Sequence, residues 1–442
     1  MTSQLNRLTI VFAAGFLAVA LATGYWQIVQ SDSLLGRVDN PRRLLTERRN
    51  PRGDIYDRNG QVLADATGTP GAWSRHYPYP ALAPVLGYVS PFLGSAGIEA
   101  AFDPVLHGDG GLDPLTIDWR TQVLGAPPPG RAVRLTIDLN LQRAADTALG
   151  AQAGAAVLLQ AQTGEILALA SHPTFDANDI DTHWTDIVNN PGSPLVNRAT
   201  QSLYQPGGVL APVVIAGALH AGLVQPDQSL PDAVLPVTVG SERIVCRQTP
   251  PSVELTLTDT LAYGCPWPVA QLAGQLGNDG LSQIFAQFHF YNAPELDIPT
   301  TAPAFTPGSQ LTDTAAAGVG QGLLTVTPLR MALVAAALAR GGQMPTPMLV
   351  LQTQNPDLGW QSARPAAPTP PVIDPAVAAE VKGMLRDGLQ ATAVTSSGGK
   401  TLAWYLGFAP FNDPQYVVVV LLEAGTPRSA KDIGDLLLGA AQ

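Results

Sequence analysis

The chain has 442 residues, enough for two or three domains with a substantial core. Charged residues make up only 13% of it, and its formal net charge is −11. Because nucleic-acid binding depends on clustered Lys and Arg, this balance argues against nucleic acid as a partner. The six histidines are scattered and neither cysteine belongs to a metal-binding motif, so we expect no metal site and no cofactor.

An uncharged run from Leu8 to Gln30 opens the chain. At about 1.5 Å per residue, such a run is long enough to cross a bilayer core of about 30 Å. Tyr25 and Trp26 lie where an aromatic interfacial belt would be. A cleaved signal peptide would have a shorter apolar core, so a retained membrane anchor is favoured. Arg7 precedes the run and five arginines follow it, which by the positive-inside rule alone would point the rest of the chain inward.

The segment after the anchor contains a hairpin signal. Residues 54–56 and 61–63 alternate like short strands around Asn59-Gly60, a dipeptide typical of tight turns. Residues 94–108 are expected to form a helix entered from a glycine turn. The segment Ala126–Gly130, with its three consecutive prolines, indicates a domain boundary, because consecutive prolines continue neither a helix nor a central strand.

Beyond this boundary the pattern predicts strands at both ends of the chain and helices between them. Together these elements indicate an α+β fold, with a sheet covered by helices. The expected elements are a strand at 133–138, a helix at 138–152, a hairpin of 155–160 with 165–171, helices and loops from about 183 to 345, strands at 402–410 and 415–425, and a helix from about 430.

Seven segments resemble, in chain order, those of monofunctional penicillin-binding proteins that work in cell elongation and division. Chance matches rarely keep such order over most of a chain. The segments are RGDIYDRNG (52–60), GIE with LHG (97–108), TIDLNLQ (136–142), TGEILALASHPTFD (163–176), NRA (197–199), GQG with TPL (320–329) and WYLGFAP (404–410).

The resemblance implies the penicillin-binding-protein transpeptidase fold, an antiparallel sheet covered by helices with a helical subdomain. It implies a cytoplasmic tip and transmembrane anchor at 1–31, a membrane-proximal, dimerisation-like pedestal at 32–130 and a transpeptidase-like domain at 131–442. The bulk of the chain would then lie outside the cytoplasm, on a single-pass anchor.

Acyl transfer on this scaffold requires a serine and a lysine one helical turn apart. They belong in the segment from Tyr204 to Pro212, where the framing proline and glycine residues are kept. The serine position is Gly208 and the lysine position is Ala211, so both the nucleophile and its base are missing. Lysine is scarce throughout, and Lys382 is the first in the chain.

The second family motif, Ser-x-Asn, is also lost. Gly264 takes the serine position and Pro266 the asparagine position, beside the apolar Trp267. A thiol can act as a nucleophile, but no histidine is close to Cys265 in the sequence. Cys246, nineteen residues earlier, would pair with Cys265 only in an oxidising compartment and only if their Cα atoms lie close enough.

The third motif, Lys-Thr-Gly, should lie on a strand before Trp404. Lys400-Thr401 resembles a remnant of it that enters the Trp404 strand directly, so we expect the motif strand to be shortened or deleted and Lys400 to be a turn residue. Ser397 and Lys400 have the serine–lysine spacing by letter, but the two intervening glycines make a poor helix start.

Loss of three motifs within a preserved frame favours a catalytically inactive pseudo-transpeptidase, a scaffold or regulator in cell-wall assembly. In the family, anchor and pedestal pair with a polytopic glycosyltransferase, which implies partner contacts at Arg52, Asp57 and Arg58. Two alternatives stay open: an active D,D-transpeptidase by an unrecognised route, and a non-covalent peptidoglycan- or peptide-binding cleft lined by Tyr204 and Trp267. For Trp267, packing that fills the vacated cleft is the favoured interpretation.

Overall fold

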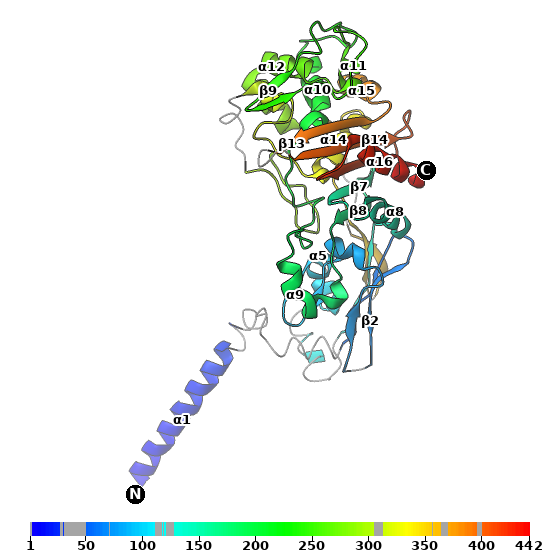
Figure 1. Ribbon diagram of the computed structural model, residues 1–442. Coiled ribbons are helices and arrows are strands. Elements are labelled where there is room, and N and C mark those ends of the chain that lie inside the picture. The colour runs from blue at the N-terminus through cyan, green and yellow to red at the C-terminus, as the bar shows by residue number, and fades with distance from the viewer. Residues whose placement is uncertain are drawn as a thin grey trace.

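The computed structural model describes most of the chain, and Figure 1 shows an N-terminal helix apart from a folded body. The described residues are 2–26, 30, 50–69, 71–110, 117, 119–120, 128–304, 313–355, 357–363, 370–395 and 400–442. The five arginines between residues 37 and 49, on which the inward-orientation argument depends, lie outside them.

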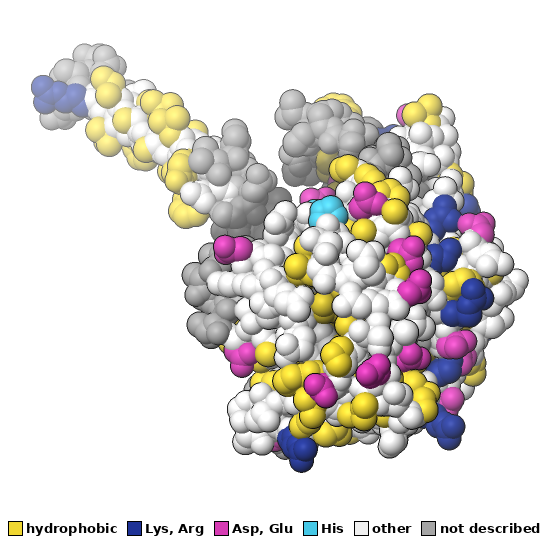
Figure 2. All heavy atoms as spheres, turned by 90° about the horizontal axis from the view of Figure 1, so that it is seen from above, with side chains coloured by type: hydrophobic (Ala, Val, Ile, Leu, Met, Phe, Trp, Pro, Cys, Tyr) yellow, Lys and Arg dark blue, Asp and Glu magenta, His cyan; other side chains and the backbone are white. Residues whose placement is uncertain are grey.

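Helix α1 (Thr2–Gly24) stands clear of the folded body. None of its apolar stretch from Arg7 to Gly24 is buried inside the molecule. Figure 2 shows a mostly hydrophobic helix surface with a basic group near its free end. By length and composition, α1 is therefore a candidate membrane span.

The membrane-proximal part is built on a six-stranded sheet in the order β12-β11-β6-β1-β2-β3. As predicted, β1 and β2 form a hairpin around the Asn59-Gly60 turn, with Tyr56 opposite Val62. The strands are β1 (Ile55–Tyr56), β2 (Val62–Thr67), β3 (Ser74–His76), β6 (Val133–Leu135), β11 (Val350–Asn355) and β12 (Gly359–Ser362).

This sheet uses residues from both sides of the boundary expected at residue 130. Strand β1 pairs in parallel with β6, with Ile55 opposite Val133, and β11 pairs with the other edge of β6. Residues 350–355 and 359–362 thus return from late in the chain to complete the sheet. Local sequence patterns do not show this, because a strand's hydrogen-bonding partner need not be near it in sequence.

The helix expected over 94–108 is instead two short helices, α5 (Gly97–Ala101) and α6 (Asp103–His107), after the two-residue strand β5 (Gly94–Ser95). The break falls at Phe102, just before Pro104 in the first turn of α6. A proline ring clashes with the preceding turn of a helix, which explains the interruption. Other short elements here are η2 (Pro80–Leu82), α4 (Ala83–Leu86) and β4 (Val89–Ser90).

The distal part is built on a five-stranded antiparallel sheet in the order β13-β14-β15-β7-β8. Its three inner strands are buried on both faces along most of their length, which explains their continuous apolar sequence. The strands are β7 (Gly154–Gln160), β8 (Ile166–His172), β13 (Leu389–Val394), β14 (Thr401–Ala409) and β15 (Tyr416–Leu422).

Helices cover both faces of this sheet. On one face, α8 (Leu139–Leu149) and α16 (Pro427–Ala441) form a hydrophobic cluster with the strands. On the other, the fully buried α14 (Pro328–Ala339) joins the larger core. Beyond α14 lies the helical subdomain (Figure 1). It contains η5 (Gly207–Leu210), α10 (Ala211–His220), α11 (Leu257–Tyr263), α12 (Pro266–Gln287), α13 (Thr314–Gly318), α15 (Pro375–Met384) and the hairpin of β9 (Val237–Val239) and β10 (Glu242–Ile244).

Hydrogen bonds of a half-buried histidine fasten α8 to the end of β8. The Nε2 of His172 lies 2.9 Å from an Asp146 carboxylate oxygen, and its Nδ1 lies 2.8 Å from the carbonyl oxygen of Gly150. The hydrogen bond to Asp146 raises the pKa of His172. Tyr79 also donates to Asp146, at 2.8 Å, and so ties the membrane-proximal part to the same carboxylate.

Candidate functional site

The three motif regions of the predicted cleft meet in one pocket. It is a cavity of about 50 Å³ between the start of α10, the α11–α12 corner and strand β13. Gly208 and Ala211 line one wall, and Gly264 and Pro266 line another. The structure thus brings together the first- and second-motif positions predicted from the sequence.

The backbone of the first motif is held in a tight frame. Gly207 has φ +54°, and a Cβ there would collide with the carbonyl oxygen of Thr392, so this position requires glycine. Its N–H donates to the Gly320 carbonyl at 2.9 Å. Next to it, a Cβ added to Gly208 would lie 3.1 Å from the Cβ of Ala391. Ala391 therefore restricts the space that a nucleophile's side chain would occupy.

The second wall is the corner between α11 and α12. Gly264 ends α11 in the left-handed conformation, with φ 62° and ψ 47°, and α12 begins at Pro266. A Cβ added to Gly264 would lie 3.0 Å from the Cβ of Arg247 and 3.4 Å from its Nε. The arginine side chain therefore packs over the position where the family has the motif serine.

The third wall corrects the sequence prediction. The strand that precedes Trp404 is not deleted, as one of the two predicted outcomes required: β13 pairs with β14 along its whole length, from Leu389 opposite Leu406 to Val394 opposite Thr401. Its residues 389–392 line the pocket. Lys400 lies at the turn into β14, where its carbonyl accepts from Thr395 N–H, and it is exposed and outside the pocket lining. Ser397 to Gly399 lie outside the described residues.

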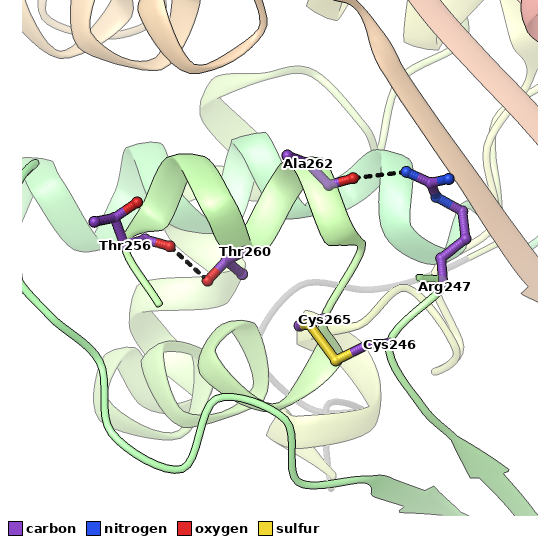
Figure 3. The surroundings of a disulfide bond; sticks show 6 residues. All are labelled: Cys246, Arg247, Thr256, Thr260, Ala262 and Cys265. Atoms are coloured by element: carbon purple, nitrogen blue, oxygen red, sulfur yellow. Dashed lines mark hydrogen bonds between the residues drawn. A yellow bond between two sulfur atoms is a disulfide. The ribbon is translucent and has the colours of Figure 1, made fainter. Parts of the chain in front are cut away.

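Figure 3 shows how Arg247 is held over the corner. A disulfide joins Cys246 to Cys265, and Arg247 Nη2 donates to the Ala262 carbonyl at 2.7 Å. Two backbone hydrogen bonds align the segment at Arg247 with the end of α11. The Arg247 N–H donates to the Gly264 carbonyl at 3.2 Å, and the Gln248 N–H donates to the Tyr263 carbonyl at 3.1 Å. Burial lowers the pKa of the Arg247 guanidinium.

The lining residues supply no nucleophile with a base. Among them, Cys265 is bonded in the disulfide, and the Thr260 hydroxyl donates to the Thr256 carbonyl at 2.9 Å. No Lys, His, Asp or Glu belongs to this lining. A serine- or threonine-type nucleophile requires a group that takes its proton, and none of these lining residues is a lysine, a histidine or a carboxylate. In the part of the chain that the structure describes, no cluster of three His, Cys, Asp or Glu side chains suits a metal.

The two residues expected to line the cleft lie elsewhere. The Tyr204 hydroxyl donates to Glu423 at 2.8 Å and its ring packs edge-on against Trp404. Trp267 packs in a small cluster with Val237, Ala270 and neighbouring apolar residues. Neither is among the pocket-lining residues, so the expectation of a cleft lined by these side chains is wrong. For Trp267 the packing interpretation describes its position.

The expected partner contacts are directed inward. Arg52 is 8% exposed and its guanidinium contacts Glu99 at 2.6 Å and Asp103 at 2.7 Å. Glu99 is fully buried and also pairs with Arg75 at 2.5 Å. Buried charges such as these must be paired with each other inside the fold, because an unpaired buried charge is strongly unfavourable. Arg52 is therefore a structural residue and does not present its charge to a partner.

Asp57 and its neighbours join the membrane-proximal sheet to the distal domain. Asp57 is fully buried, and its carboxylate accepts from Gln61 N–H at 2.7 Å and from Leu139 N–H, at the start of α8, at 3.1 Å. Arg58, which is partly exposed, pairs with Glu165 at 3.1 Å. The RGDIYDRNG segment thus forms an internal joint, which corrects the predicted role of Asp57 as a partner contact.

Two site features were missed at the sequence level. The alternation Leu389-Gln390-Ala391-Thr392 is a strand signal, but it is short and precedes a glycine-rich turn. Arg247 carries no motif of its own. Its place in the pocket depends on the disulfide and on backbone pairing with a segment some fifteen residues later.

Comparison with known families defines the class of protein. The family model of the penicillin binding protein transpeptidase domain matches residues 154–435, and that of the penicillin binding protein A dimerisation domain matches residues 52–133. The chain therefore belongs to the monofunctional (class B) penicillin-binding protein transpeptidase family, as the sequence motifs predicted.

Individual relatives extend this result over the whole chain. Peptidoglycan D,D-transpeptidase PbpA of Mycobacterium tuberculosis is 30% identical over 99% of this chain and 96% of its own length. Peptidoglycan D,D-transpeptidase MrdA of Escherichia coli (strain K12) is 28% identical over 76% of this chain and 59% of its own. These relatives place the chain among the penicillin-binding-protein-like proteins of cell-wall synthesis.

Solved structures confirm the fold. Penicillin-binding protein A from M. tuberculosis, as a ceftriaxone acyl-enzyme complex, matches with a TM-score of 0.80 and 28% identity, over 90% of this chain and 99% of that one. The D,D-transpeptidase domain of a peptidoglycan glycosyltransferase from Eggerthella lenta gives a TM-score of 0.78 at 26% identity, over 89% and 98% of the two chains.

Proposed function

We propose that this protein acts in peptidoglycan synthesis without forming an acyl-enzyme, as a scaffold or regulator of a cell-wall glycosyltransferase. The observation that carries the proposal is the pocket itself. At the first-motif positions it presents Gly208 and Ala211, and no lysine, histidine or carboxylate lines it. The M. tuberculosis relative is described as an acyl-enzyme with ceftriaxone, and formation of that species requires a nucleophile that this pocket lacks.

The buried joint between the two parts of the body supports a role for the fold itself. The buried Asp57 and the Arg58–Glu165 pair hold the membrane-proximal sheet against the distal domain. We propose that a change of position at one end is passed to the other through this joint. Such coupling suits a protein that carries information between a membrane partner and the cell-wall face, and it needs no catalytic residues.

Two features support the cellular location that we propose. Helix α1 is long and apolar enough for a single-pass anchor. The disulfide between Cys246 and Cys265 is typical of proteins outside the reducing cytoplasm. We therefore place the folded body on the extracytoplasmic side, against the direction suggested by the arginines after the anchor.

The test is labelling of the full chain with a fluorescent penicillin, followed by denaturing electrophoresis. Purified M. tuberculosis PbpA serves as the labelled control. We expect no covalent band from this chain under conditions that label the control fully. A stable band would overturn the proposal and favour the alternative of an active D,D-transpeptidase, and mass spectrometry would then locate the acylated residue.

The scaffold role requires a separate test. Full chain in membranes should co-purify with a polytopic glycosyltransferase, and a variant lacking residues 2–26 should lose that association. If the polymerising activity of the captured glycosyltransferase is the same with and without this chain, the regulatory role is wrong.

A further inference from the structure

A second cavity lies in the membrane-proximal part of the body. It has a volume of about 230 Å³ and lies between the outer strand β3, the end of α6, strand β4 and the start of α9 (Ile180–Val188). Among the described residues, its lining shares none with the pocket at the transpeptidase motifs. A ligand of this cavity would therefore be bound apart from the family's acylation site.

The lining of this cavity includes a buried arginine with an unused donor. The Arg75 side chain is 5% exposed, its Nε contacts Glu99 at 2.5 Å, and its Nη1 donates to the Gly53 carbonyl at 2.9 Å. Its Nη2 is buried and has no hydrogen-bond partner within the described part of the chain. Since a buried donor without an acceptor is unfavourable, Nη2 favours a ligand that brings an oxygen atom to it.

His107 adds a second donor to the lining. Its Nδ1 lies 2.8 Å from Nη1 of Arg52, and a guanidinium can only donate. Nδ1 therefore accepts this hydrogen bond, which leaves the ring proton on Nε2. Both Arg75 and His107 thus bring N–H donors to the lining.

Asp181 supplies an acceptor that is held in place. Its carboxylate, in the first turn of α9, accepts from the Ser90 hydroxyl. Ser90 is fully buried, and its Oγ accepts from the N–H groups of Phe92 and Leu93 at 3.0 and 2.9 Å. An ionised carboxylate can only accept, so Asp181 favours a ligand with hydroxyl groups.

The balance of charge argues against an anion as the ligand. Glu99 pairs with both arginines of the lining. Asp103 also pairs with Arg52, and Asp181 adds a further carboxylate to the lining. An anion would have to be buried beside these carboxylates without a cation of its own, which is unfavourable. The cavity therefore favours a neutral ligand that both donates and accepts hydrogen bonds.

The size and the apolar surface of the cavity suit a sugar ring. At about 30 Å³ for each water molecule, the cavity has the volume of roughly seven or eight of them, which suits one six-membered ring with a short substituent. Trp73 contributes an indole surface to the lining, and Val89 and Ile180 contribute aliphatic groups. A sugar ring combines hydroxyl groups with faces of C–H groups, and such a ligand matches apolar walls that carry a few placed polar groups.

We propose that this cavity binds a neutral sugar ring that carries an acetamido group. The acetamido carbonyl and the ring oxygens supply acceptors for Arg75 and His107, and a sugar hydroxyl donates to Asp181. The indole of Trp73 covers one C–H face of the ring, and the acetamido methyl group lies against the aliphatic side chains. The site goes beyond the proposed function, because it assigns a ligand to the membrane-proximal part whether or not the distal pocket forms an acyl-enzyme.

The experiment measures binding of two neutral sugars to the full chain by saturation-transfer NMR. The chain is held in lipid nanodiscs, because sugar-based detergents would compete for the site. The probes are triacetylchitotriose and maltotriose, which has no acetamido groups. We expect saturable transfer to chitotriose and roughly tenfold weaker binding of maltotriose, since the acceptor for a buried donor is lost. Equal binding of the two sugars, or no transfer to chitotriose, would overturn the proposal.

Inorganic phosphate tests the argument from charge. An excess of phosphate should leave the transfer to chitotriose unchanged, because the carboxylates around the cavity disfavour an anion. Displacement of the sugar by phosphate, but not by sodium chloride at the same ionic strength, would show an anion site and would overturn the proposal.

Three variants localise the site. Trp73→Ala and Asp181→Asn should each weaken chitotriose binding roughly tenfold, the first through loss of an apolar contact and the second through loss of an acceptor. Asparagine keeps the shape of Asp181 and still accepts from Ser90 through its carbonyl, so the fold is retained. Phe92→Ala is the matched control, because Phe92 is 68% exposed and outside the lining. If Trp73→Ala and Asp181→Asn bind chitotriose as tightly as Phe92→Ala does, the assignment to this cavity is wrong.

Discussion

A serine returned to position 208 should destabilise the domain, and removal of the Ala391 methyl group should relieve most of that effect. In Gly208→Ser the new Cβ would lie 3.1 Å from the Cβ of Ala391, inside the usual carbon–carbon separation of about 3.5–4.0 Å. Neither the backbone at position 208 nor strand β13 can move away easily. The Gly207 N–H next to the new serine is hydrogen-bonded to the Gly320 carbonyl, and β13 is paired with β14 along its length.

The magnitude follows from the size of the clash. Overpacking of a close-packed site costs about 1–3 kcal/mol, so Gly208→Ser should lower the free energy of unfolding by that amount. Ala391→Gly alone should lower it by about 0.5–1 kcal/mol, the usual effect of glycine within a strand. In the double variant the clash is gone, so the loss should be about 1 kcal/mol, less than the sum of the single losses.

The assay is urea unfolding of the full chain in detergent, followed by tryptophan fluorescence. Gly274→Ser is the matched control, because a Cβ at this helical position meets no atom within 4 Å. Since serine exceeds glycine in helix propensity, this variant should be as stable as the natural chain or slightly more so. If Gly208→Ser is equally well tolerated, or if its effect and that of Ala391→Gly add within about 0.5 kcal/mol, the pocket is not closed by Ala391.

Three further predictions concern the residues that hold the body together. Arg52→Ala should lower the free energy of unfolding by about 3–5 kcal/mol, because it leaves Glu99 buried without one of its two arginine partners. Arg58 is more exposed, so Arg58→Ala should lower it by about 1 kcal/mol or less. Urea titrations compare the two variants, and similar losses would contradict the internal role of Arg52. Cys246→Ser opens a disulfide with a sequence separation of 19 and should cost about 3 kcal/mol, which thermal unfolding with and without reductant would measure; an unchanged midpoint in both would contradict it. The pKa of His172 is raised in the folded state, so its contribution to the free energy of unfolding is complete below the unfolded-state pKa of about 6.5 and is lost as the pH rises through the folded-state pKa. His172→Gln should therefore flatten the decline in the free energy of unfolding above about pH 6.5. Identical pH profiles for the two proteins would refute this prediction.

Local patterns were sufficient for the parts of the fold that depend on neighbouring residues. Alternating or continuous apolar runs predicted the hairpin of β7 and β8 and the pair β14 and β15, and Asn59-Gly60 predicted the β1–β2 turn. The absence of the nucleophile and its base at Gly208 and Ala211 is equally a property of the sequence. No arrangement of the chain supplies a side chain that these residues lack.

The sequence by itself thus determined the family, the order of the main elements and the absence of a serine and a lysine at positions 208 and 211. Only the tertiary structure decided that β13 completes the sheet, that Arg52 and Asp57 face inward, and that Arg247 reaches the pocket. The physical reason is that helix and strand signals arise from residues a few positions apart, whereas burial and charge pairing depend on which distant segments meet. In this protein, distant segments are brought together by strand pairing, by buried ion pairs and by a disulfide. None of these contacts produces a periodic pattern in the sequence.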